Sequence, residues 1–414
     1  MRIAMIGPFG LRPKGTMSVR ALPLARALAE RGHAVRMVLP PWDFPQDAGS
    51  MKRDAGVEVE NIELTASVPG LFHLRITRRL VQRALDFQPD VIHCFKPKAY
   101  AGLAAWWLWQ LKRLGRVKAR LIVDTDDWEG AGGWNDFRNQ GSGSADQGVR
   151  SRGQYSWAQK KMFAWQEQWG LTHNDGVTVA SKALQSIIWS LGVKPAQVVY
   201  VPNGVVNSEW GTRNSELGIR NSAHRTPHSE FRILLYTRFF EFKIERVLEV
   251  LRRVVEQVPE AKLIVVGKGF NGEEEQLLVL AEAIGLRGSI ECAGWVDTAA
   301  LPGYFAQTAV AIYPFDDTLI NRTKCSVKLI DLLSAGVPVV ADAVGQNLEY
   351  IRHDATGVLV SSGDVAAMAQ AVIELLRDRE KAGRLGRCAA QEMPTRFSWK
   401  RLVLDVERIY GVID

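Results

Sequence analysis

Short runs of β-branched and other apolar residues alternate with amphipathic stretches along the whole chain. In the first half, strands are expected at Arg2–Gly7, Ala34–Leu39, Val91–Phe95, Leu121–Asp124, Gly176–Ala180 and Val198–Val201. In the second half, they are expected at Arg232–Thr237, Lys262–Val266, Ser289–Cys292, Val310–Tyr313, Val337–Ala341 and Gly357–Val360. Because strands that alternate with helices are typical of parallel α/β layers, the pattern predicts an α/β protein.

Apolar residues at helical spacing predict the helices between these strands. The clearest stripe, with a period near 3.6 residues, consists of Ile244, Val247, Leu248, Leu251, Val254, Val255 and Val258. A helix over Val327–Ser334 is expected to begin at Ser326, a suitable N-cap residue. Two more helices are expected over Val19–Glu30 and Phe397–Tyr410.

Two such half-chains flank a polar segment, which indicates two doubly wound domains. Val206–Glu230 is rich in Asn, Ser, Arg and His and has little apolar periodicity. We therefore expect a domain over residues 1–205, a linker over 206–230, a second domain over 231–395, and a C-terminal helix over 396–414 that packs back toward the first domain. The Gly/Ser-rich stretch Gly130–Gln154 predicts a long loop that is either a functional lid or disordered.

The composition, with 47% apolar and 23% charged residues, is that of an ordinary globular protein. Four cysteines without a CxxC pair argue against a structural zinc site and a disulfide scaffold, and favour a reducing cytosol. The first residues are strand-like and show no signal-peptide layout. The longest uncharged apolar stretch has thirteen residues, whereas a spanning helix needs about 20. We therefore expect a cytoplasmic protein without a membrane span.

The net charge of +7 is concentrated in one patch, because residues 70–120 hold eleven Lys/Arg and two acids. Such a patch favours phosphate, in nucleic acid, in lipid headgroups or in a small substrate. Trp106, Trp107 and Trp109 lie within it, and this pairing of aromatic and basic residues resembles an interfacial membrane helix. Tryptophans in the core beside solvated arginines are the alternative. No sequence pattern of a nucleic-acid-binding motif is present, which disfavours a nucleic-acid partner.

Two expected helix starts carry cations where acids are usual. Arg238 ends a predicted strand and Lys243 stands at the mouth of the next helix. Lys324 and Lys328 flank the helix start at Ser326, and the first carboxylate beyond is Asp331. Both places favour an anion such as a diphosphate, and Asp331 is suited to accept hydrogen bonds from sugar or ribose hydroxyls. Solvated surface charges, and an ion pair between Asp331 and Lys328, are the alternatives.

Three further patterns are less specific. The glycines near Gly15-Thr16 allow a ligand to approach the end of the first strand, although tight turns need glycine anyway. The four acids in Asp124–Glu129 predict a raised pKa or contact with water, a cation or a polyol; no histidine cluster supports a metal there. Gly267–Gly272 fits the dinucleotide motif G-x-G-x-x-G, but Glu273, Glu274 and Glu275 would repel a pyrophosphate.

In their order and spacing, several segments resemble the family 4 glycosyltransferases, retaining enzymes of the GT-B fold. The segments are Ile3–Gly7 with Gly15, Leu28–Val35, Val201–Val205, Tyr236–Arg238 with Lys243, Gly294–Val296, Ala335–Ala341 and Thr356–Val360. They correspond to the family's first strand and glycine loop, its "LAERGHEV" run, and its "PNGV", "GRL…K", "GWV", "AGxPVVA" and "TGxLV" segments. The resemblance covers nearly the whole chain.

The resemblance implies two Rossmann-like domains facing a central cleft, a nucleoside-diphosphate sugar as donor substrate, and neither a cofactor nor a metal ion. Arg238 and Lys243 are implied to be catalytic, because their cations hold the donor diphosphate. The implied donor-binding residues are Gly15, Thr16, Trp295, Val296, Lys324, Cys325, Ser326, Val327 and Asp331.

The chain departs from the family's pattern at two places. Of the family's two glutamates, the second corresponds to Asp331 and the first to Thr323, which carries no charge. Where many members have a histidine at the end of an N-domain strand, this chain has Asp126 or Asp127. These two aspartates are therefore the candidates for a catalytic role on the acceptor side.

The predicted function is that of a retaining, metal-independent hexosyltransferase. It moves a sugar from a nucleoside-diphosphate sugar to a lipid-linked or polysaccharide acceptor. Residues 70–120 would attach it peripherally to the anionic inner face of the membrane. A nucleotide-sugar epimerase or a sugar phosphorylase of the same fold is one alternative. A non-catalytic membrane-surface or nucleic-acid binder that uses the basic patch is the other.

Overall fold

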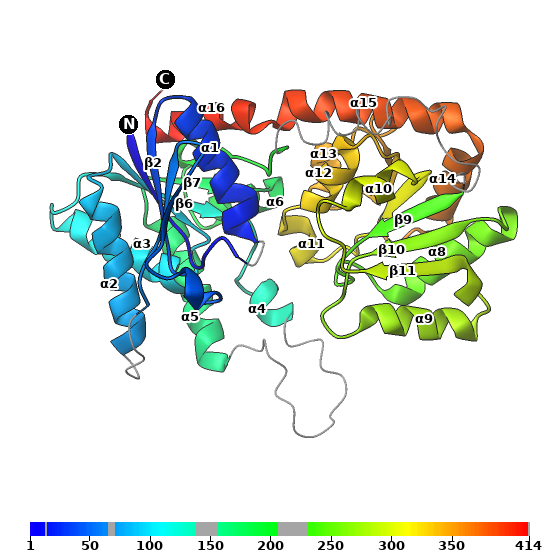
Figure 1. The fold of residues 1–414 in the computed structure, drawn as a ribbon, viewed down its shortest axis with the longest axis horizontal. Helices are drawn as coiled ribbons and strands as arrows, with labels where there is room; N and C mark the ends of the chain where they lie inside the picture. Colours follow the sequence, from blue (N-terminus) through cyan, green and yellow to red (C-terminus); the bar gives the residue numbers. More distant parts are fainter. Residues whose placement is uncertain (13–14, 65–70, 138–155, 206–230, 413–414) are drawn as a thin grey trace. The chain divides into compact units, whose positions relative to one another are not determined.

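The computed structural model describes residues 1–12, 15–64, 71–137, 156–205 and 231–412 (Figure 1). The expected linker 206–230, and residues 138–155 of the Gly/Ser-rich stretch, lie outside the described residues. The chain divides into two compact units. Unit 1 comprises Met1–Gly204, Thr323–Cys325 and Trp399–Asp414, and unit 2 comprises Val205–Arg322 and Ser326–Ser398.

Unit 1 is built on an eight-stranded sheet with the order β3-β4-β2-β1-β5-β6-β7-β8. Its strands are β1 (Arg2–Ile6), β2 (Ala34–Leu39), β3 (Met51–Asp54), β4 (Val57–Asn61), β5 (Val91–Phe95), β6 (Arg120–Thr125), β7 (Gly176–Val179) and β8 (Val198–Tyr200). Every pairing is parallel except that of β3 with β4. From β1, the chain adds strands first on one side and then, starting with β5, on the other.

Helices cover both faces of this sheet. They are α1 (Leu22–Glu30), α2 (Leu71–Asp86), α3 (Ala99–Arg113), α4 (Trp134–Phe137), α5 (Trp157–Thr172), α6 (Lys182–Ser190) and α16 (Trp399–Tyr410), with a π-helical turn at Met17–Ala21 and 3₁₀ turns at Pro45–Asp47 and Pro195–Gln197. Leu24 and Val403, from α1 and α16, share one core cluster with Ile3 of β1. Leu80 and Leu108, from α2 and α3, form another with Ala4 and Ile6. Because side chains alternate along β1, they pack into two cores, one on each face of the sheet.

Unit 2 is built on a six-stranded parallel sheet with the order β11-β10-β9-β12-β13-β14. Its strands are β9 (Arg232–Tyr236), β10 (Lys262–Val266), β11 (Ile290–Gly294), β12 (Val310–Tyr313), β13 (Val339–Asp342) and β14 (Val358–Val360). Its helices are α8 (Ile244–Gln257), α9 (Glu273–Ala283), α10 (Leu301–Ala306), α11 (Leu319–Thr323), α12 (Val327–Ser334), α13 (Asn347–Tyr350), α14 (Val365–Arg377) and α15 (Arg379–Phe397), with a 3₁₀ turn at Arg287–Ser289. The predicted stripe of α8 packs with α14 on one face, and α12 with α15 on the other.

The structure confirms the expected class, two doubly wound α/β units, and shows three local differences. The strands β3 and β4 were not expected, because their short sequences contain several charged residues. The helix expected over Val19–Glu30 begins with the π-helical turn, and the C-terminal run breaks at Ser398 between α15 and α16. Within the described ranges, no helix combines the length and the apolarity needed to cross a bilayer.

Candidate functional site

In a doubly wound sheet, ligands bind at the carboxyl ends of the strands, where the strand order changes direction. In unit 1 this switch point lies between β1 and β5, and in unit 2 it lies between β9 and β12. Arg238 and Lys243 follow β9, and the start of α12 follows β12. Thr16 follows β1, and Asp126 follows β6, which is the neighbour of β5. These candidate residues therefore lie at or beside the switch point of each unit.

In unit 2, Arg238 leaves the end of β9 through an unusual turn. Phe239 has a left-handed φ of 68°, which is rare for an aromatic residue and is stabilised by its N–H donating to Thr237 Oγ1 over 2.8 Å. The Arg238 guanidinium lies 4.6 Å from the ring centroid of Phe270, in the loop after β10. This loop and the turn together set the direction of the half-buried guanidinium.

Lys243 is the N-cap residue of α8, and its side chain is exposed. Its main-chain N–H donates to Asp316 (3.1 Å), and Asp316 also binds the Arg246 guanidinium (2.6 Å). Among the residues that the structure describes, no carboxylate forms an ion pair with the Lys243 ammonium. The nearby acid is thus paired with Arg246 and not with the Lys243 ammonium.

The start of α12 lies at the same switch point. The Ser326 N–H donates to Gln346 Oε1 (2.7 Å), while the Ser326 side chain makes no capping hydrogen bond to the helix. Lys328 lies 5.4 Å from the ring of Tyr236, at the end of β9. Burial, and then the nearby Asp331 carboxylate, raise the pKa of Tyr236 well above its ordinary value. Val327, Lys328 and Asp331 therefore lie beside the end of β9.

Trp295 and Val296 lie farther along the same edge, directly after β11. The Trp295 ring is 66% exposed, whereas Val296 packs on the apolar cluster beneath. An exposed aromatic ring anchored by a packed neighbour offers a flat surface, which suits a stacked base.

The G-x-G-x-x-G loop after β10 has a different use. Gly267 has a φ of 129°, and a Cβ there would lie 1.9 Å from the Thr237 carbonyl oxygen, so only glycine fits. The Gly269 N–H donates to Glu274 (2.9 Å), and the Asn271 N–H donates to Glu273 (2.7 Å). Because protein carboxylates already occupy these two N–H groups, neither amide is available to a pyrophosphate.

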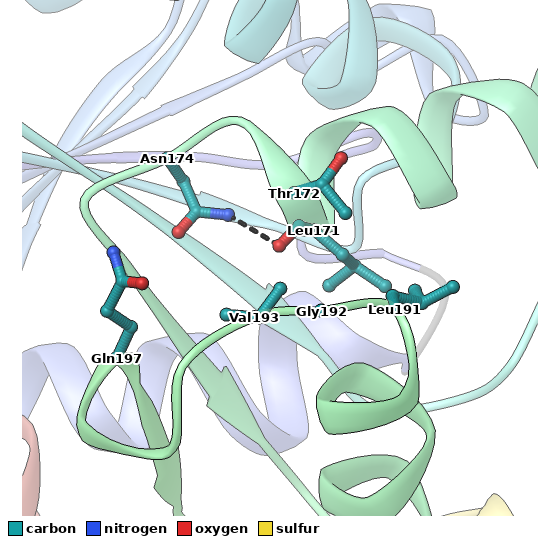
Figure 2. A pocket seen from close by; sticks show the side chains of 7 residues that line it. All are labelled: Leu171, Thr172, Asn174, Leu191, Gly192, Val193 and Gln197. Carbon is teal, nitrogen blue, oxygen red and sulfur yellow. Dashed lines mark hydrogen bonds between the residues drawn. The ribbon is translucent and has the colours of Figure 1, made fainter.

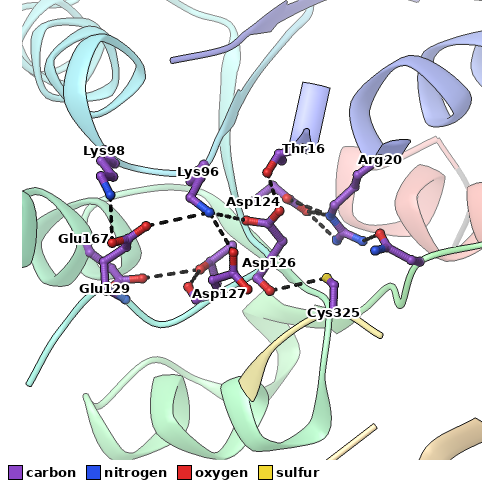
Figure 3. Close-up of polar contacts among 12 residues, drawn as sticks. Thr16, Arg20, Lys96, Lys98, Asp124, Asp126, Asp127, Glu129, Glu167 and Cys325 are labelled. Carbon is purple, nitrogen blue, oxygen red and sulfur yellow. Dashed lines mark hydrogen bonds and ion pairs between the residues drawn. The ribbon is translucent and has the colours of Figure 1, made fainter. Parts of the chain in front are cut away.

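In unit 1, a buried ion pair supports the end of β6 (Figure 3). Arg20 donates from Nε and Nη2 to Asp124, at 2.8 and 2.6 Å, and both side chains are buried. Thr178 Oγ1 donates to the same carboxylate over 2.6 Å. Burial raises the pKa of Asp124 more than these partners lower it. The pair cross-links the helix start after β1 to β6 and β7.

Thr16 and Asp126, both predicted site residues, are in direct contact. Thr16 Oγ1 donates to Asp126 Oδ2 over 2.5 Å, and Lys96 lies 3.4 Å from Asp126 and 2.7 Å from Asp127 (Figure 3). Burial opposes ionisation of Asp126, but Lys96, Thr16 and Arg20 outweigh it, so its pKa is lowered. The pKa of Asp127 is raised, because burial and the Asp126 charge exceed the effect of Lys96. Asp126 is therefore the more readily ionised member of the pair.

Two more acids complete this cluster. Lys98 donates to Glu129 over 2.8 Å, and the Glu129 N–H donates to Glu167 of α5 over 2.7 Å. Burial, and then the Glu129 charge, raise the pKa of Glu167 well above its ordinary value. The acids after β6 are thus partnered by cations of the same chain, and the described residues contain no group of His, Cys, Asp and Glu suited to hold a metal ion.

A directed hydrogen-bond chain extends from this cluster to α16. Burial, and then Arg20, lower the pKa of His93 to about 3, so the ring is neutral. Because Thr178 donates to Asp124, it accepts from His93 Nε2 (3.1 Å), and His93 Nδ1 then accepts from Tyr410 (2.7 Å). The C-terminal helix is thereby connected to the ion pair beside the candidate site.

Sequence reasoning missed Arg20, His93 and Glu167, which carry no motif. It counted Lys96 and Lys98 as part of a basic surface patch, and the structure corrects this: both are paired with acids after β6. In the same patch, Arg79, Arg83 and Lys112 also pair with acids: Glu63, Glu60, Asp86 and Asp175. The exposed basic surface is therefore smaller than the charge count predicted.

The remaining predicted residues lie as follows. Gly15 donates its N–H to Ser18 Oγ (2.9 Å) at the start of the π-helical turn. Lys324 is buried and Cys325 half-buried, and the segment Thr323–Cys325 is grouped with unit 1. Thr16 and Asp126 thus belong to unit 1, whereas Arg238, Lys243, Trp295, Val296, Ser326, Val327 and Asp331 belong to unit 2.

A pocket of about 250 Å³ lies elsewhere in unit 1, between the segments that lead into β7 and β8 (Figure 2). Leu171, Asn174, Leu191 and Gln197 are among its lining residues. The Asn174 amide already donates to the main-chain oxygens of Gly170 and Leu171. The pocket therefore lies at the amino ends of the strands and includes none of the candidate residues.

Comparison with known proteins identifies the family of this chain. A model described as a glycosyl transferase 4-like domain matches residues 15–204, and one described as glycosyl transferases group 1 matches residues 230–378. Among solved structures, sucrose-phosphate synthase from Thermosynechococcus elongatus superposes with a TM-score of 0.69 at 20% identity, covering 99% of this chain and 98% of that one. HepE from Anabaena, in complex with UDP-glucose, has a TM-score of 0.65 at 15% identity and full coverage of both chains.

Two curated relatives are mannosyltransferases. The phosphatidyl-myo-inositol mannosyltransferase of Mycobacterium leprae is 25% identical over 100% of this chain and 97% of its own length. The GDP-mannose-dependent α-(1-6)-phosphatidylinositol monomannoside mannosyltransferase of Mycobacterium tuberculosis is 28% identical over 55% of this chain and 59% of its own length. With these matches along both units, the chain belongs to the family 4 glycosyltransferases and is a transferase of the GT-B fold.

Proposed function

We propose that the protein transfers a sugar from a nucleoside-diphosphate sugar to a lipid-linked or polysaccharide acceptor, with retention at the anomeric carbon. The observation that carries the donor class is the switch point of unit 2. There Arg238 and Lys243 supply two cations, and the helices α8 and α12 begin without a side-chain cap. Helix N-termini and fixed cations together favour a diphosphate.

Arg238 and Lys243 act on the leaving group in this proposal. As the bond from the anomeric carbon to the diphosphate breaks, negative charge grows on the diphosphate oxygens. Fixed cations that are already in place stabilise this charge without reorganisation. Asp331 accepts hydrogen bonds from the ribose, and Trp295 with Val296 supports the base. The proposal includes no cofactor and no metal ion, and so expects transfer to continue in EDTA.

Asp126 and Thr16 serve the other reactant. The pKa of Asp126 lies below its ordinary value, so the carboxylate is ionised at neutral pH. Thr16 and Lys96 hold it at the carboxyl edge of the sheet. From there we propose that it accepts a hydrogen bond from a hydroxyl of the bound sugar or acceptor. The proposal also gives Gly15, Lys324 and Cys325 a role in donor binding.

A lipid acceptor and a peripheral position at the inner face of the membrane are the favoured forms of this proposal. The mannosyltransferase that matches the whole chain is named for phosphatidyl-myo-inositol. The exposed arginines Arg75, Arg78, Arg113 and Arg116 lie within residues 70–120, and none pairs with an acid among the described side chains.

A thermal-shift screen with UDP-, GDP-, ADP- and dTDP-linked sugars tests the donor class. A ligand present at about 100 times its Kd adds about 2.7 kcal/mol to the free energy of unfolding, which raises Tm. We expect one nucleotide series to raise Tm and the others to have little effect. The nucleotide sugar that raises Tm is then incubated with the protein, with and without an acceptor and with and without phosphate. Turnover that requires an acceptor indicates a transferase, turnover without an acceptor indicates an epimerase, and turnover that requires phosphate indicates a phosphorylase. Failure of every nucleotide sugar to raise Tm would contradict the proposal.

A further inference from the structure

Helix α5 of unit 1 exposes several large apolar residues. Its buried face carries Phe163 and Leu171 together with the polar residues Gln166 and Glu167, each 1% exposed. Its outward face carries Trp157, Met162 and Trp165, which are 75%, 39% and 46% exposed. A surface helix normally buries its apolar residues and exposes its polar ones. Large aromatic side chains gathered on an outward face mark an interaction surface.

Three tryptophans and a lysine of α5 form a stripe, whose last member, Trp169, is half-buried. Trp157, Lys161, Trp165 and Trp169 are four residues apart, a spacing that places side chains above one another on a helix. The Lys161 ammonium lies 6.0 Å from the Trp157 ring, and the rings of Trp165 and Trp169 are 6.1 Å apart. Trp169 stacks on His173 at 4.4 Å. The stripe therefore runs along the whole helix.

Neighbouring helices extend this surface. Within unit 1, α2 packs beside α3, and α3 packs beside α5. The first turn of α2 exposes Leu71 and Leu74, and α3 exposes Trp106. Helices that follow parallel strands begin at the carboxyl edge of the sheet. The first turns of α2 and α5 therefore lie toward the edge that holds Asp126, and in Figure 1 both helices begin at the lower side of unit 1.

The positive charge of this surface favours an anionic partner. The single acid of α5 is the buried Glu167, and α3 contains none. Arg75, Arg78 and Lys161 are exposed, and none forms an ion pair with an acid in the described part of the chain. Tryptophan beside lysine and arginine is the pattern of a protein that binds at an anionic bilayer surface. A two-fold contact between copies of this chain would place the same cations opposite each other, and their repulsion disfavours a second copy as the partner.

We propose that the outward face of α5, together with the first turn of α2, is the surface through which unit 1 docks on an anionic lipid bilayer. The tryptophans enter the headgroup region, and the basic side chains contact lipid phosphates. This inference rests on the proposed function, because docking there brings a lipid acceptor to the sheet edge that carries Thr16 and Asp126. It differs from attachment through the basic patch 70–120 alone, because it assigns the insertion of apolar side chains into the bilayer to α5, which lies outside that patch.

Vesicle flotation tests the docking surface. We expect the full chain to bind vesicles of phosphatidylcholine with phosphatidylglycerol and to bind pure phosphatidylcholine weakly. The double variant Trp157→Ser/Trp165→Ser should bind the anionic vesicles at least about tenfold more weakly, because its apolar face is lost. Lys161→Ala should weaken binding about fivefold, as expected for one basic residue. Trp189→Ser is the matched control, since Trp189 is 42% exposed on α6, and it should bind like the wild type.

Three results would overturn the proposal. The first is unchanged flotation of the double variant, and the second is equal binding to both vesicle types. The third is a dimer of the wild type in light scattering that the double variant converts to a monomer, which would assign the face to a second copy. The donor-induced rise in Tm is measured on the same proteins. If it persists while flotation is unchanged, docking on α5 fails and the transferase proposal stands; if the wild type shows none, the transferase proposal fails.

Discussion

At the scale of single residues, the candidate site combines groups that sequence identifies with groups that it does not. Arg238 and Lys243 stand at a strand end and a helix start, so their positions follow from hydrophobic periodicity and a short pattern. The roles of Lys96 and Arg20 depend on pairing with acids that are 31 and 104 positions away along the chain. Such pairing exists only once β1, β5 and β6 lie side by side, and a local pattern cannot reveal it.

His93 provides a test of the buried network by pH. Its pKa is lowered to about 3 in the folded protein by burial and then by Arg20, against about 6.5 in an unfolded chain. Between these values the unfolded state binds one more proton, so stability is complete above about pH 6.5 and falls as the pH drops. The free energy of unfolding should lose about 1.4 kcal/mol per pH unit from this ring.

The comparison is between the wild type and His93→Gln, by denaturant unfolding from pH 7 to pH 4. Thr178 and Tyr410, which contact the ring, and Arg20, whose charge acts on it, are common to both proteins. The variant should show the shallower pH dependence. Equal slopes, or a His93 ring that titrates above pH 5 by NMR in the folded protein, would contradict the buried neutral imidazole.

At the scale of elements, the sequence predicts what is buried and regular. The strands of both sheet centres are nearly continuous apolar runs, because parallel sheets are covered on both faces. The hairpin β3–β4 escapes prediction, since Lys52, Arg53 and Asp54 make up most of β3. The start of α12 at Val327 matches the expectation from Ser326, although no side-chain cap forms.

The C-terminal helix α16 supplies part of the core of unit 1. Glu407 is buried and binds Arg31 (2.6 Å) and His33 (2.9 Å), two residues of the run that resembles "LAERGHEV". Leu402 and Val403 join the core cluster of β1 and α1. This helix therefore completes a face of the first sheet from the far end of the chain.

Leu402→Ala tests this packing. Leu402 is 4% exposed, and a buried leucine truncated to alanine costs about 2–5 kcal/mol because it loses transfer free energy and leaves a cavity. Lys400→Ala, on the exposed side of the same helix, should change stability by less than about 0.5 kcal/mol. The measurement is denaturant unfolding followed by far-UV circular dichroism. Equal midpoints for the two variants would show that α16 does not complete the core.

At the scale of the whole molecule, one physical idea connects the fold to the chemistry. Each sheet reverses its strand order once, and the side chains with candidate roles follow strands at that point or farther along the same carboxyl edge. The sequence shows this for unit 2, where the cations lie close together along the chain. It shows less for unit 1, where burial and distant pairing lower the pKa of Asp126 and raise that of Asp127.

The most direct test is the rate of sugar transfer by Arg238→Ala and Lys243→Ala, measured with the donor that the thermal-shift screen identifies. Arg384→Ala is the control, an exposed arginine on α15 of unit 2. If the two cations stabilise the departing diphosphate, each variant should keep its Tm and lose at least about 100-fold in kcat, while Arg384→Ala should turn over like the wild type. Near-normal turnover by either folded variant would contradict the account.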